Sequence, residues 1–208
     1  AGGGGGDARA TALSEGSVRL LGALGAWPDL AGDAVPIRRV EVSQQGHMGR
    51  TRIDAAEEGV EALGRVVPLE RLGEVLACRA RAAPGVEWLA PARVVDASAG
   101  ADAAQVTVAI EGGVGTRRVA LVVAADGTGS PVRQALGIGT RVHDYGQTAL
   151  LAQIEAGGDP LTAHERFTRD GPLALLPARA GRRTLVWTVP GGRAPEIAAL
   201  GPDAFAAA

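Results

Sequence analysis

The sequence lacks lysine and asparagine altogether, and it has a single cysteine and few aromatic residues. One cysteine, Cys78, excludes an internal disulfide and a zinc site built from several cysteines. No apolar run approaches the ~18 residues that a membrane-spanning helix needs. The formal net charge of -2 argues against a strongly basic nucleic-acid binder and against a disordered acidic tail. The 46% hydrophobic and 21% charged residues are typical of a soluble globular protein.

The two ends of the sequence are unusual. The only methionine is Met48, the chain begins with Ala1 followed by five glycines, and it stops at Ala208 inside an expected helix. The sequence shows none of the three parts of a leader peptide, which are a charged region, an apolar region and a cleavage site. We therefore expect an internal piece of a longer protein, with residues 2–6 forming a flexible linker.

Periodicity predicts helices over residues 14–27 and 69–83 and a hairpin whose strands cover 37–43 and 50–53. The core face of the first helix is expected to consist of Leu20, Leu21, Leu24 and Trp27. Further short strands are expected at 86–89, 93–96, 105–110, 148–154, 165–168, 173–176 and 184–189. Helices and strands in the middle, then consecutive strands, suggest a parallel α/β part and a largely antiparallel part. The hairpin is expected to belong to the second part.

A continuous apolar run over residues 119–125 predicts a strand covered on both faces, as in a parallel sheet. It ends in Asp126-Gly127, after which Ser130 suits a helix N-cap and Pro131 a first helical position. Ligands of open α/β sheets bind at the carboxyl ends of strands, where bare glycines and a helix N-terminus can accept a phosphate. The segment is either such a site or a tight turn in which Asp126 bonds to its own loop.

This segment also carries a family resemblance. Ala125-Asp126-Gly127-x-x-Ser130-x-Val132-Arg133 resembles the Asp-Gly motif of flavin-dependent aromatic hydroxylases of the para-hydroxybenzoate hydroxylase class, although Gly129 replaces a larger polar or basic residue. Other segments are similar to the ubiquinone-biosynthesis hydroxylases of that class, above all to the 2-polyprenyl-6-methoxyphenol hydroxylase family. They lie at residues 7–14, 40–47, 62–67, 83–86, 145–149, 165–177 and 186–187.

The resemblance implies an α/β fold in which a partial Rossmann-like FAD-binding domain is interleaved with a largely antiparallel β-sheet substrate domain. Residues 1–36 and 55–137 are expected in the FAD-binding domain, and residues 37–54 and 138–208 in the substrate-domain sheet. Two motifs of the family are absent from this sequence: the G-x-G-x-x-G around the FAD pyrophosphate and a later Gly-Asp motif near the FAD ribose. The isolated chain is therefore expected to be inactive.

The resemblance further implies that the cofactor carries out the chemistry, so no catalytic side chain and no metal site are expected. Arg9 is expected to contact the phosphates of FAD or NAD(P)H, and Arg71 lies on a helix that contributes a polar FAD contact in relatives. The other cofactor candidates are Asp126, Gly127, Ser130 and Arg133. The substrate candidates are His47, Tyr145, Gln147, Phe167, Pro172 and Leu173, with Tyr145 and Gln147 alternating on one strand. Exposed-turn or core roles remain open for these residues.

The function implied by the resemblance is hydroxylation of a polyprenylated methoxyphenol ring in ubiquinone biosynthesis, with FAD as cofactor and NAD(P)H and O₂ as co-substrates. A sibling hydroxylase acting on another aromatic compound and a non-catalytic folded remnant are the alternatives. The resemblance also implies a cytoplasmic location, peripheral to the inner membrane. Other quinone-biosynthesis proteins are the implied partners, with no nucleic acid and no transmembrane segment.

Overall fold

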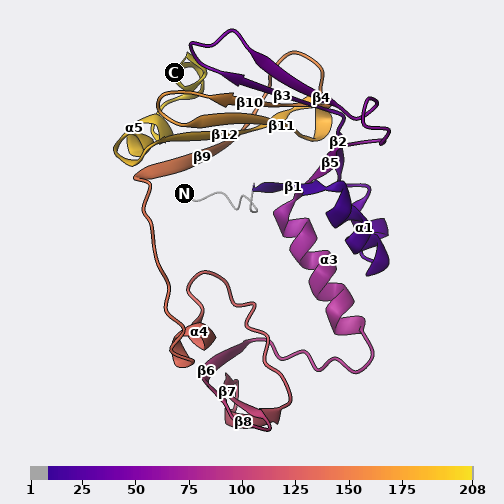
Figure 1. Cartoon of the computed structure of the whole chain (residues 1–208), viewed down its shortest axis with the longest axis vertical. Coiled ribbons are helices and arrows are strands. Elements are labelled where there is room, and N and C mark those ends of the chain that lie inside the picture. Colours follow the sequence, from indigo (N-terminus) through magenta and orange to yellow (C-terminus); the bar gives the residue numbers. More distant parts are fainter. Residues whose placement is uncertain (1–8, 208) are drawn as a thin grey trace. The chain divides into compact units, whose positions relative to one another are not determined.

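The computed structural model describes residues 9–207, which form two compact units (Figure 1). The first unit runs to Ala82 and resumes at Asp144, and the second unit is Ala83–His143. These units differ from the predicted division at residues 36, 54 and 137, because the second half of the presumed FAD-binding region packs by itself. The functional division into cofactor and substrate domains stays a prediction.

The first unit contains two sheets and most of the helices. Its N-terminal elements are β1 (Ala10–Ser14), α1 (Glu15–Ala23), α2 (Trp27–Leu30), β2 (Val35–Ile37), β3 (Arg39–Gln44), β4 (Arg50–Asp54), β5 (Gly64–Pro68) and α3 (Leu69–Ala82). Its C-terminal elements are β9 (Gln147–Ile154), β10 (Thr162–Phe167), β11 (Pro172–Pro177), η1 (Arg179–Gly181), β12 (Arg183–Pro190), η2 (Gly191–Arg193), α5 (Ala194–Ala198) and α6 (Pro202–Ala207).

The larger sheet of the first unit has the strand order β4-β3-β10-β11-β12-β9 (Figure 1). Every pairing in it is antiparallel except β3 with β10, which run parallel. The predicted hairpin thus joins the C-terminal strands, although more than 100 residues separate them in the sequence. The sheet is largely antiparallel, as expected. The smaller sheet, β1-β5-β2, is antiparallel throughout.

The two faces of the six-stranded sheet have different neighbours. One face, which we call the pocket face, contains Val40, Ala163 and Leu176 and packs against Ile37 and Val66 near the smaller sheet. Leu176 pairs with Thr184 of β12, and Thr184 pairs with Gln153 of β9, so both of these residues also belong to the pocket face. The opposite face, which we call the helix face, packs Leu150, Trp187 and Val189 against α5 and α6. Because side chains alternate along a strand, these rows define which residues share a face.

The first core lies where α1, α2 and α3 meet. Leu21, Ala26, Leu30 and Val75 are buried there, with Leu13, Trp27 and Leu72 packed against them. The predicted single helix over residues 14–27 is wrong, because α1 ends before Gly25, whose φ of +70° suits glycine after a helix. The predicted core stripe is partly wrong as well. The buried face runs through Val18 and Leu21, so Leu20 and Leu24 point to solvent.

The second unit is a small antiparallel sheet with one short helix. It consists of β6 (Ala92–Ala99), β7 (Ala104–Ile110), β8 (Gly113–Val119) and α4 (Pro131–Ala135), in the order β6-β7-β8. The predicted parallel strand at 119–125 is wrong beyond Val119, and Leu121 and Val123 are 76% and 77% exposed. A strand needs a ladder partner, and no described residue pairs with residues 120–125. The strand predicted at 86–89 is likewise unpaired.

Candidate functional site

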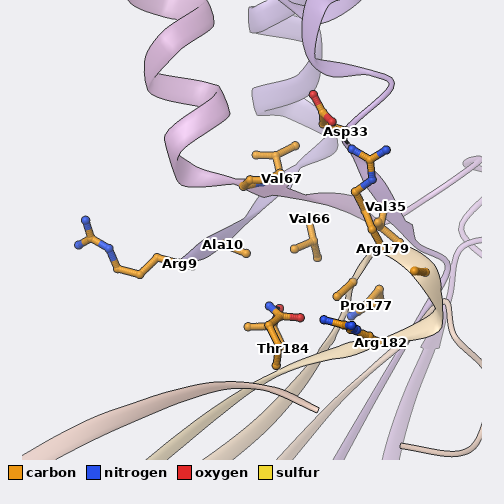
Figure 2. Close-up of a pocket in the computed structure, with 14 residues that line it drawn as sticks. Arg9, Ala10, Asp33, Val35, Val66, Val67, Pro177, Arg179, Arg182 and Thr184 are labelled. Atoms are coloured by element: carbon orange, nitrogen blue, oxygen red, sulfur yellow. Dashed lines mark hydrogen bonds and ion pairs between the residues drawn. The ribbon is translucent and has the colours of Figure 1, made fainter. Parts of the chain in front are cut away.

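The first unit has a cavity of about 360 Å³ between its two sheets (Figure 2). Its apolar lining comes mainly from Val35, Val66, Val67 and Pro177, and Thr184 and Gln153 extend it along the pocket face. The complete lining is Arg9, Ala10, Asp33, Val35, Val66, Val67, Pro68, Gln153, Pro177, Ala178, Arg179, Ala180, Arg182 and Thr184. A largely apolar cavity with a few polar groups at its edge is a usual form for a small-molecule site.

Positive charge predominates around this cavity. Three of its lining residues, Arg9, Arg179 and Arg182, are arginines, and Asp33 is the only carboxylate among them. Asp33 is already engaged, because its two oxygens accept from Arg179 and, at 3.1 Å, from Nε of Arg71. Hydrogen bonds to Glu74 and then to Asp33 raise the pKa of Arg71. Guanidinium groups in the lining suit an anionic group such as a phosphate.

The predicted cofactor residue Arg9 lies at this cavity, at the margin shown in Figure 2. Sequence reasoning missed the other polar lining residues: Asp33, Gln153, Arg179, Arg182 and Thr184. The sequence contained one signal for these residues, because Arg179, Arg182 and Arg183 cluster around the turn Ala180-Gly181. Its link to Arg9 depends on strand pairing across the whole unit, which no local pattern reveals.

Three predicted substrate residues meet at the far end of the pocket face. Phe167 and Pro172 are a cross-strand pair between β10 and β11, and Phe167 is 47% exposed. The side-chain amide of Gln147 donates to the carbonyl of Asp170 in the adjoining turn, at 3.5 Å. Phe167 is four residues from Ala163 along β10, which corresponds to about 13 Å. The pocket face therefore connects the cavity with these side chains.

Gly171 allows the turn that presents Pro172. Its φ is +147°, and a Cβ atom at this position would lie 2.6 Å from the carbonyl oxygen of Thr188 on β12. Any side chain here would therefore collide with the neighbouring strand. The hydroxyl of Thr168 closes the same turn by donating to the carbonyl of Gly171 at 2.6 Å.

The remaining substrate candidates lie elsewhere. Leu173 pairs with Trp187 and so belongs to the helix face, since neighbours in a strand point to opposite sides. Tyr145 precedes β9, and Gly146 with φ +63° interrupts the predicted alternation with Gln147. His47 lies in the exposed turn between β3 and β4. These three residues do not join Phe167 and Pro172 in one row.

The Asp-Gly segment of the second unit is held by its own hydrogen bonds. Ser130 is buried and caps α4 by accepting from the N–H of Arg133 at 3.0 Å, and Pro131 begins the helix, as predicted. A hydrogen bond with Ser130, helped by the Val132 N–H, lowers the pKa of Asp126. The guanidinium of Arg133 donates to the carbonyl of Thr128 at 2.6 Å.

Open space remains beside the backbone of this segment. Gly127 has a φ of +84°, and a Cβ atom at Gly127 or Gly129 would have no neighbour within 4 Å. The carboxylate of Asp126 thus stabilises its own loop, while the glycines leave room for a ligand to approach the main chain. The fold is compatible with both of the roles that the sequence left open for this segment.

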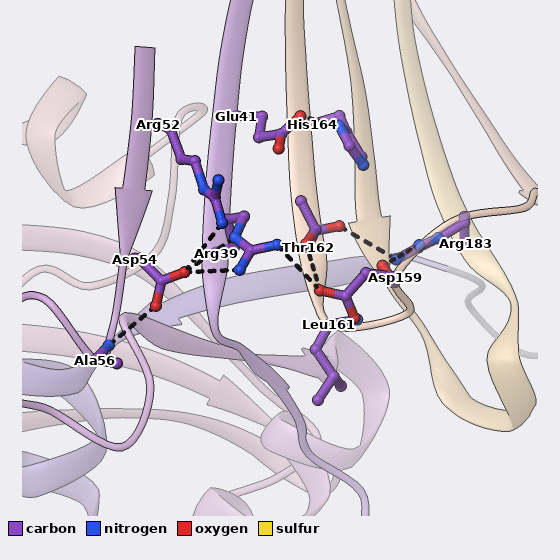
Figure 3. A network of polar contacts seen from close by, with 10 residues as sticks. All are labelled: Arg39, Glu41, Arg52, Asp54, Ala56, Asp159, Leu161, Thr162, His164 and Arg183. Carbon is purple, nitrogen blue, oxygen red and sulfur yellow. Dashed lines mark hydrogen bonds and ion pairs between the residues drawn. The ribbon is translucent and has the colours of Figure 1, made fainter.

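A second polar cluster lies on the helix face, where β3 and β10 pair (Figure 3). Arg183 is 1% exposed and donates to the carbonyls of Thr162, at 3.2 Å, and Asp159. Arg39 connects Asp54, at 2.8 Å, with Asp159, at 3.9 Å. Its hydrogen bond lowers the pKa of Asp54, and a hydrogen bond from the Thr162 hydroxyl lowers that of Asp159. These contacts hold the parallel strand pair together.

No group of three or more His, Cys, Asp and Glu side chains within residues 9–207 is arranged to hold a metal ion. None of the helices in this part of the chain is long and apolar enough to cross a membrane.

Comparison with known proteins shows that the chain is similar to two hydroxylases named for ubiquinone or ubiquinol. The chain is 34% identical over 202 residues to ubiquinone hydroxylase UbiL of Rhodospirillum rubrum, covering 97% of this chain and 46% of UbiL. It is 34% identical over 188 residues to 3-demethoxyubiquinol 3-hydroxylase of Escherichia coli, covering 87% of this chain and 46% of that protein. The chain thus spans about half the length of these relatives.

The fold is also similar to that of a solved flavoprotein. The structure of Klebsiella pneumoniae HpxO complexed with FAD and uric acid matches with a TM-score of 0.65 and 21% identity, covering 87% of this chain and 47% of that chain. A family model described as "FAD binding domain" matches residues 5–196. The chain therefore belongs to the FAD-binding domain family, with the α/β architecture of FAD-dependent monooxygenases.

Proposed function

We propose that this chain is part of an FAD-dependent monooxygenase that uses NAD(P)H and O₂ to hydroxylate a polyprenylated methoxyphenol ring in ubiquinone biosynthesis. The observation that carries the proposal is 34% identity to two ubiquinone-pathway hydroxylases over most of the chain, combined with a cationic cavity that contains the predicted cofactor residue Arg9. The pathway, the NAD(P)H requirement and the ring that is hydroxylated rest on similarity to those relatives.

The donor set of the cavity fits an anionic dinucleotide. Arg9, with Arg179 and Arg182, would hold phosphate oxygens of FAD, because guanidinium groups bind phosphates in bidentate fashion. In the second unit, the bare backbone at Gly127 admits close approach, and Asp126, Ser130 and Arg133 keep that loop in shape. When bound, the flavin supplies the electrons and the oxygen chemistry.

The protein side of the reaction is binding, orientation and exclusion of water. The pocket face of the sheet offers an apolar surface that ends at Phe167 and Pro172, against which an aromatic ring would pack. Gln147 would orient the ring from the same end, where its amide already donates to a backbone carbonyl. His47, Tyr145 and Leu173 lie away from the surface that ends at Phe167 and Pro172, so we assign them no contact with the ring.

A polyprenylated substrate favours an enzyme that works in the cytoplasm at the surface of the inner membrane, near other proteins of quinone synthesis. Hydroxylation of a different aromatic compound by the same family of enzyme is the second candidate. The fold does not distinguish the two candidates, because HpxO, crystallised with FAD and uric acid, shares it at 21% identity. A non-catalytic remnant is the third, since the chain has neither the G-x-G-x-x-G nor the later Gly-Asp motif.

The test uses the whole protein encoded by the gene in a bacterial strain that lacks a quinone-pathway hydroxylase. We expect rescue of quinone synthesis by the wild type and at least tenfold weaker FAD binding by Arg9→Gln, because a hydrogen bond to a charged group contributes about 1.5–3 kcal/mol. Arg19→Gln, an exposed arginine on α1, is the matched control. FAD retention through gel filtration and quinone content are the readouts.

The three candidates give different results. FAD binding without rescue, combined with hydroxylation of a soluble phenol, would establish the sibling enzyme. A whole protein that binds no FAD would be the remnant. The 208-residue chain alone is expected to lose FAD on gel filtration, so stoichiometric yellow protein would contradict its expected inactivity.

A further inference from the structure

One end of the six-stranded sheet carries arginines that the hydroxylase site does not use. β3 and β10 run parallel and end together at Gln44 and Phe167. The turn after β3 and the turn after β10 are joined by two hydrogen bonds: the Gln45 N–H donates to the Phe167 carbonyl at 2.8 Å, and the Arg169 N–H donates to the Gln45 side chain at 3.3 Å. The two turns therefore form one surface.

Arg50, Arg166 and Arg169 are the cations of this surface. Arg50 and Arg166 lie on either side of Ser43 on the helix face, so their backbones are about 10 Å apart. All three side chains are exposed, and none of them forms an ion pair with any carboxylate in residues 9–207. The only described hydrogen bond of these guanidinium groups joins Arg166 to the Ser43 hydroxyl at 3.4 Å.

Two carboxylates near these arginines are bound by other arginines. Asp170, in the same turn as Arg169, accepts from Arg193 at 2.9 Å, and Asp54 is bound by Arg39. Glu41 lies 3.6 Å from His164, and Glu165 lies on the pocket face, opposite to Arg166. The end of the sheet therefore has a net positive charge that no described partner neutralises, unlike the balanced cluster of Figure 3 beside it.

Met48 adds an exposed apolar side chain on the turn that precedes Arg50. It lies at the tip of the turn between β3 and β4, two residues before Arg50, and is fully exposed. Exposed apolar side chains that accompany cations are a combination that peripheral proteins use at anionic lipids, where the apolar group enters the acyl boundary and the cations meet the headgroups.

We propose that the surface formed by Met48, Arg50, Arg166 and Arg169 docks on an anionic lipid membrane. Charge complementarity selects an anionic partner, and the exposed methionine favours a lipid layer over an acidic protein. The choice of lipid also rests in part on the proposed function, because a polyprenylated phenol resides in membranes. The test below needs neither FAD nor turnover, so its failure is separate from failure of the proposed hydroxylation.

The test is sedimentation of the 208-residue chain with vesicles of phosphatidylglycerol mixed with phosphatidylcholine, compared with phosphatidylcholine alone. We expect binding to the mixed vesicles only, and its loss at about 1 M salt, where the Debye length is about 3 Å. The triple variant Arg50→Gln, Arg166→Gln, Arg169→Gln should bind about 100-fold more weakly, since each arginine near an anionic surface contributes about a factor of five. Met48→Ser should bind about fivefold more weakly.

The matched control is Arg93→Gln, Arg118→Gln, Arg141→Gln, which removes three exposed arginines from the second unit and changes the net charge equally. It should bind as the wild type does. Equal losses in the two triple variants, binding to both kinds of vesicle alike, or an unchanged affinity of Met48→Ser would overturn the proposal. Binding to polyglutamate without binding to vesicles would overturn it in favour of an acidic protein partner.

Discussion

Replacement of Arg183 tests the account of how the six-stranded sheet is held together. The guanidinium is 1% exposed and donates to the carbonyls of Thr162 and Asp159, which flank the start of β10. Methionine has a similar length and no donors, so Arg183→Met leaves both carbonyls without this partner. The substitution isolates the contribution of these two hydrogen bonds.

The expected loss follows from the number and kind of these bonds. A hydrogen bond from a charged donor contributes about 1.5–3 kcal/mol, but removal of a buried charge also recovers part of its desolvation cost. Two bonds at the lower value give a loss of about 3 kcal/mol in the free energy of unfolding. With a urea m-value of about 2 kcal/mol/M, the unfolding midpoint should fall by about 1.5 M.

The assay is urea unfolding followed by the fluorescence of Trp187, which lies on the same face of β12 as Arg183. Trp27→Phe and Trp88→Phe in all proteins leave Trp187 as the single reporter. Arg182→Met, at the exposed neighbouring position, is the control and should stay within about 0.5 kcal/mol of its parent. A midpoint for Arg183→Met equal to that of Arg182→Met would refute the assignment of Arg183 as the anchor of β10.

Two other predictions concern the turn and the ion pairs of the same sheet. Gly171→Ala should lower the free energy of unfolding by about 2–3 kcal/mol, since its Cβ would lie 2.6 Å from the carbonyl oxygen of Thr188. The control Gly192→Ala, whose Cβ would have no neighbour within 4 Å, should leave the free energy of unfolding unchanged. Equal urea midpoints of the two variants would contradict this prediction. The lowered pKa of Asp54 means that its stabilisation is present at neutral pH and is lost as the pH falls below about 4. Asp54→Asn should therefore have a lower urea midpoint than wild type at about pH 7, and the difference should shrink as the pH falls from about 4 through the lowered pKa of Asp54. A difference independent of pH would argue against the ion pair.

Local patterns were sufficient for much of the secondary structure. The alternation in β7, the apolar periodicity of α3 and the cap at Ser130 depend on residues within one turn or one strand. The same pattern of neighbours also implies that Pro172 and Leu173 face opposite sides, so both could not line one site. The errors at Leu24 and over residues 119–125 arose where an apolar pattern was taken as evidence of burial.

The sequence by itself determined the family, through the Asp-Gly motif and the segments that accompany it, because those motifs are contiguous in the chain. It also predicted a place for Arg9 in a cofactor site, which stays a prediction. Only the tertiary structure decided which side chains share a surface. The parallel pairing of β3 with β10 brings Arg50 next to Arg166, and the meeting of two sheets brings Arg9 and Arg179 to one cavity. Such contacts join residues more than 100 positions apart, so they depend on strand register and packing rather than on any local pattern.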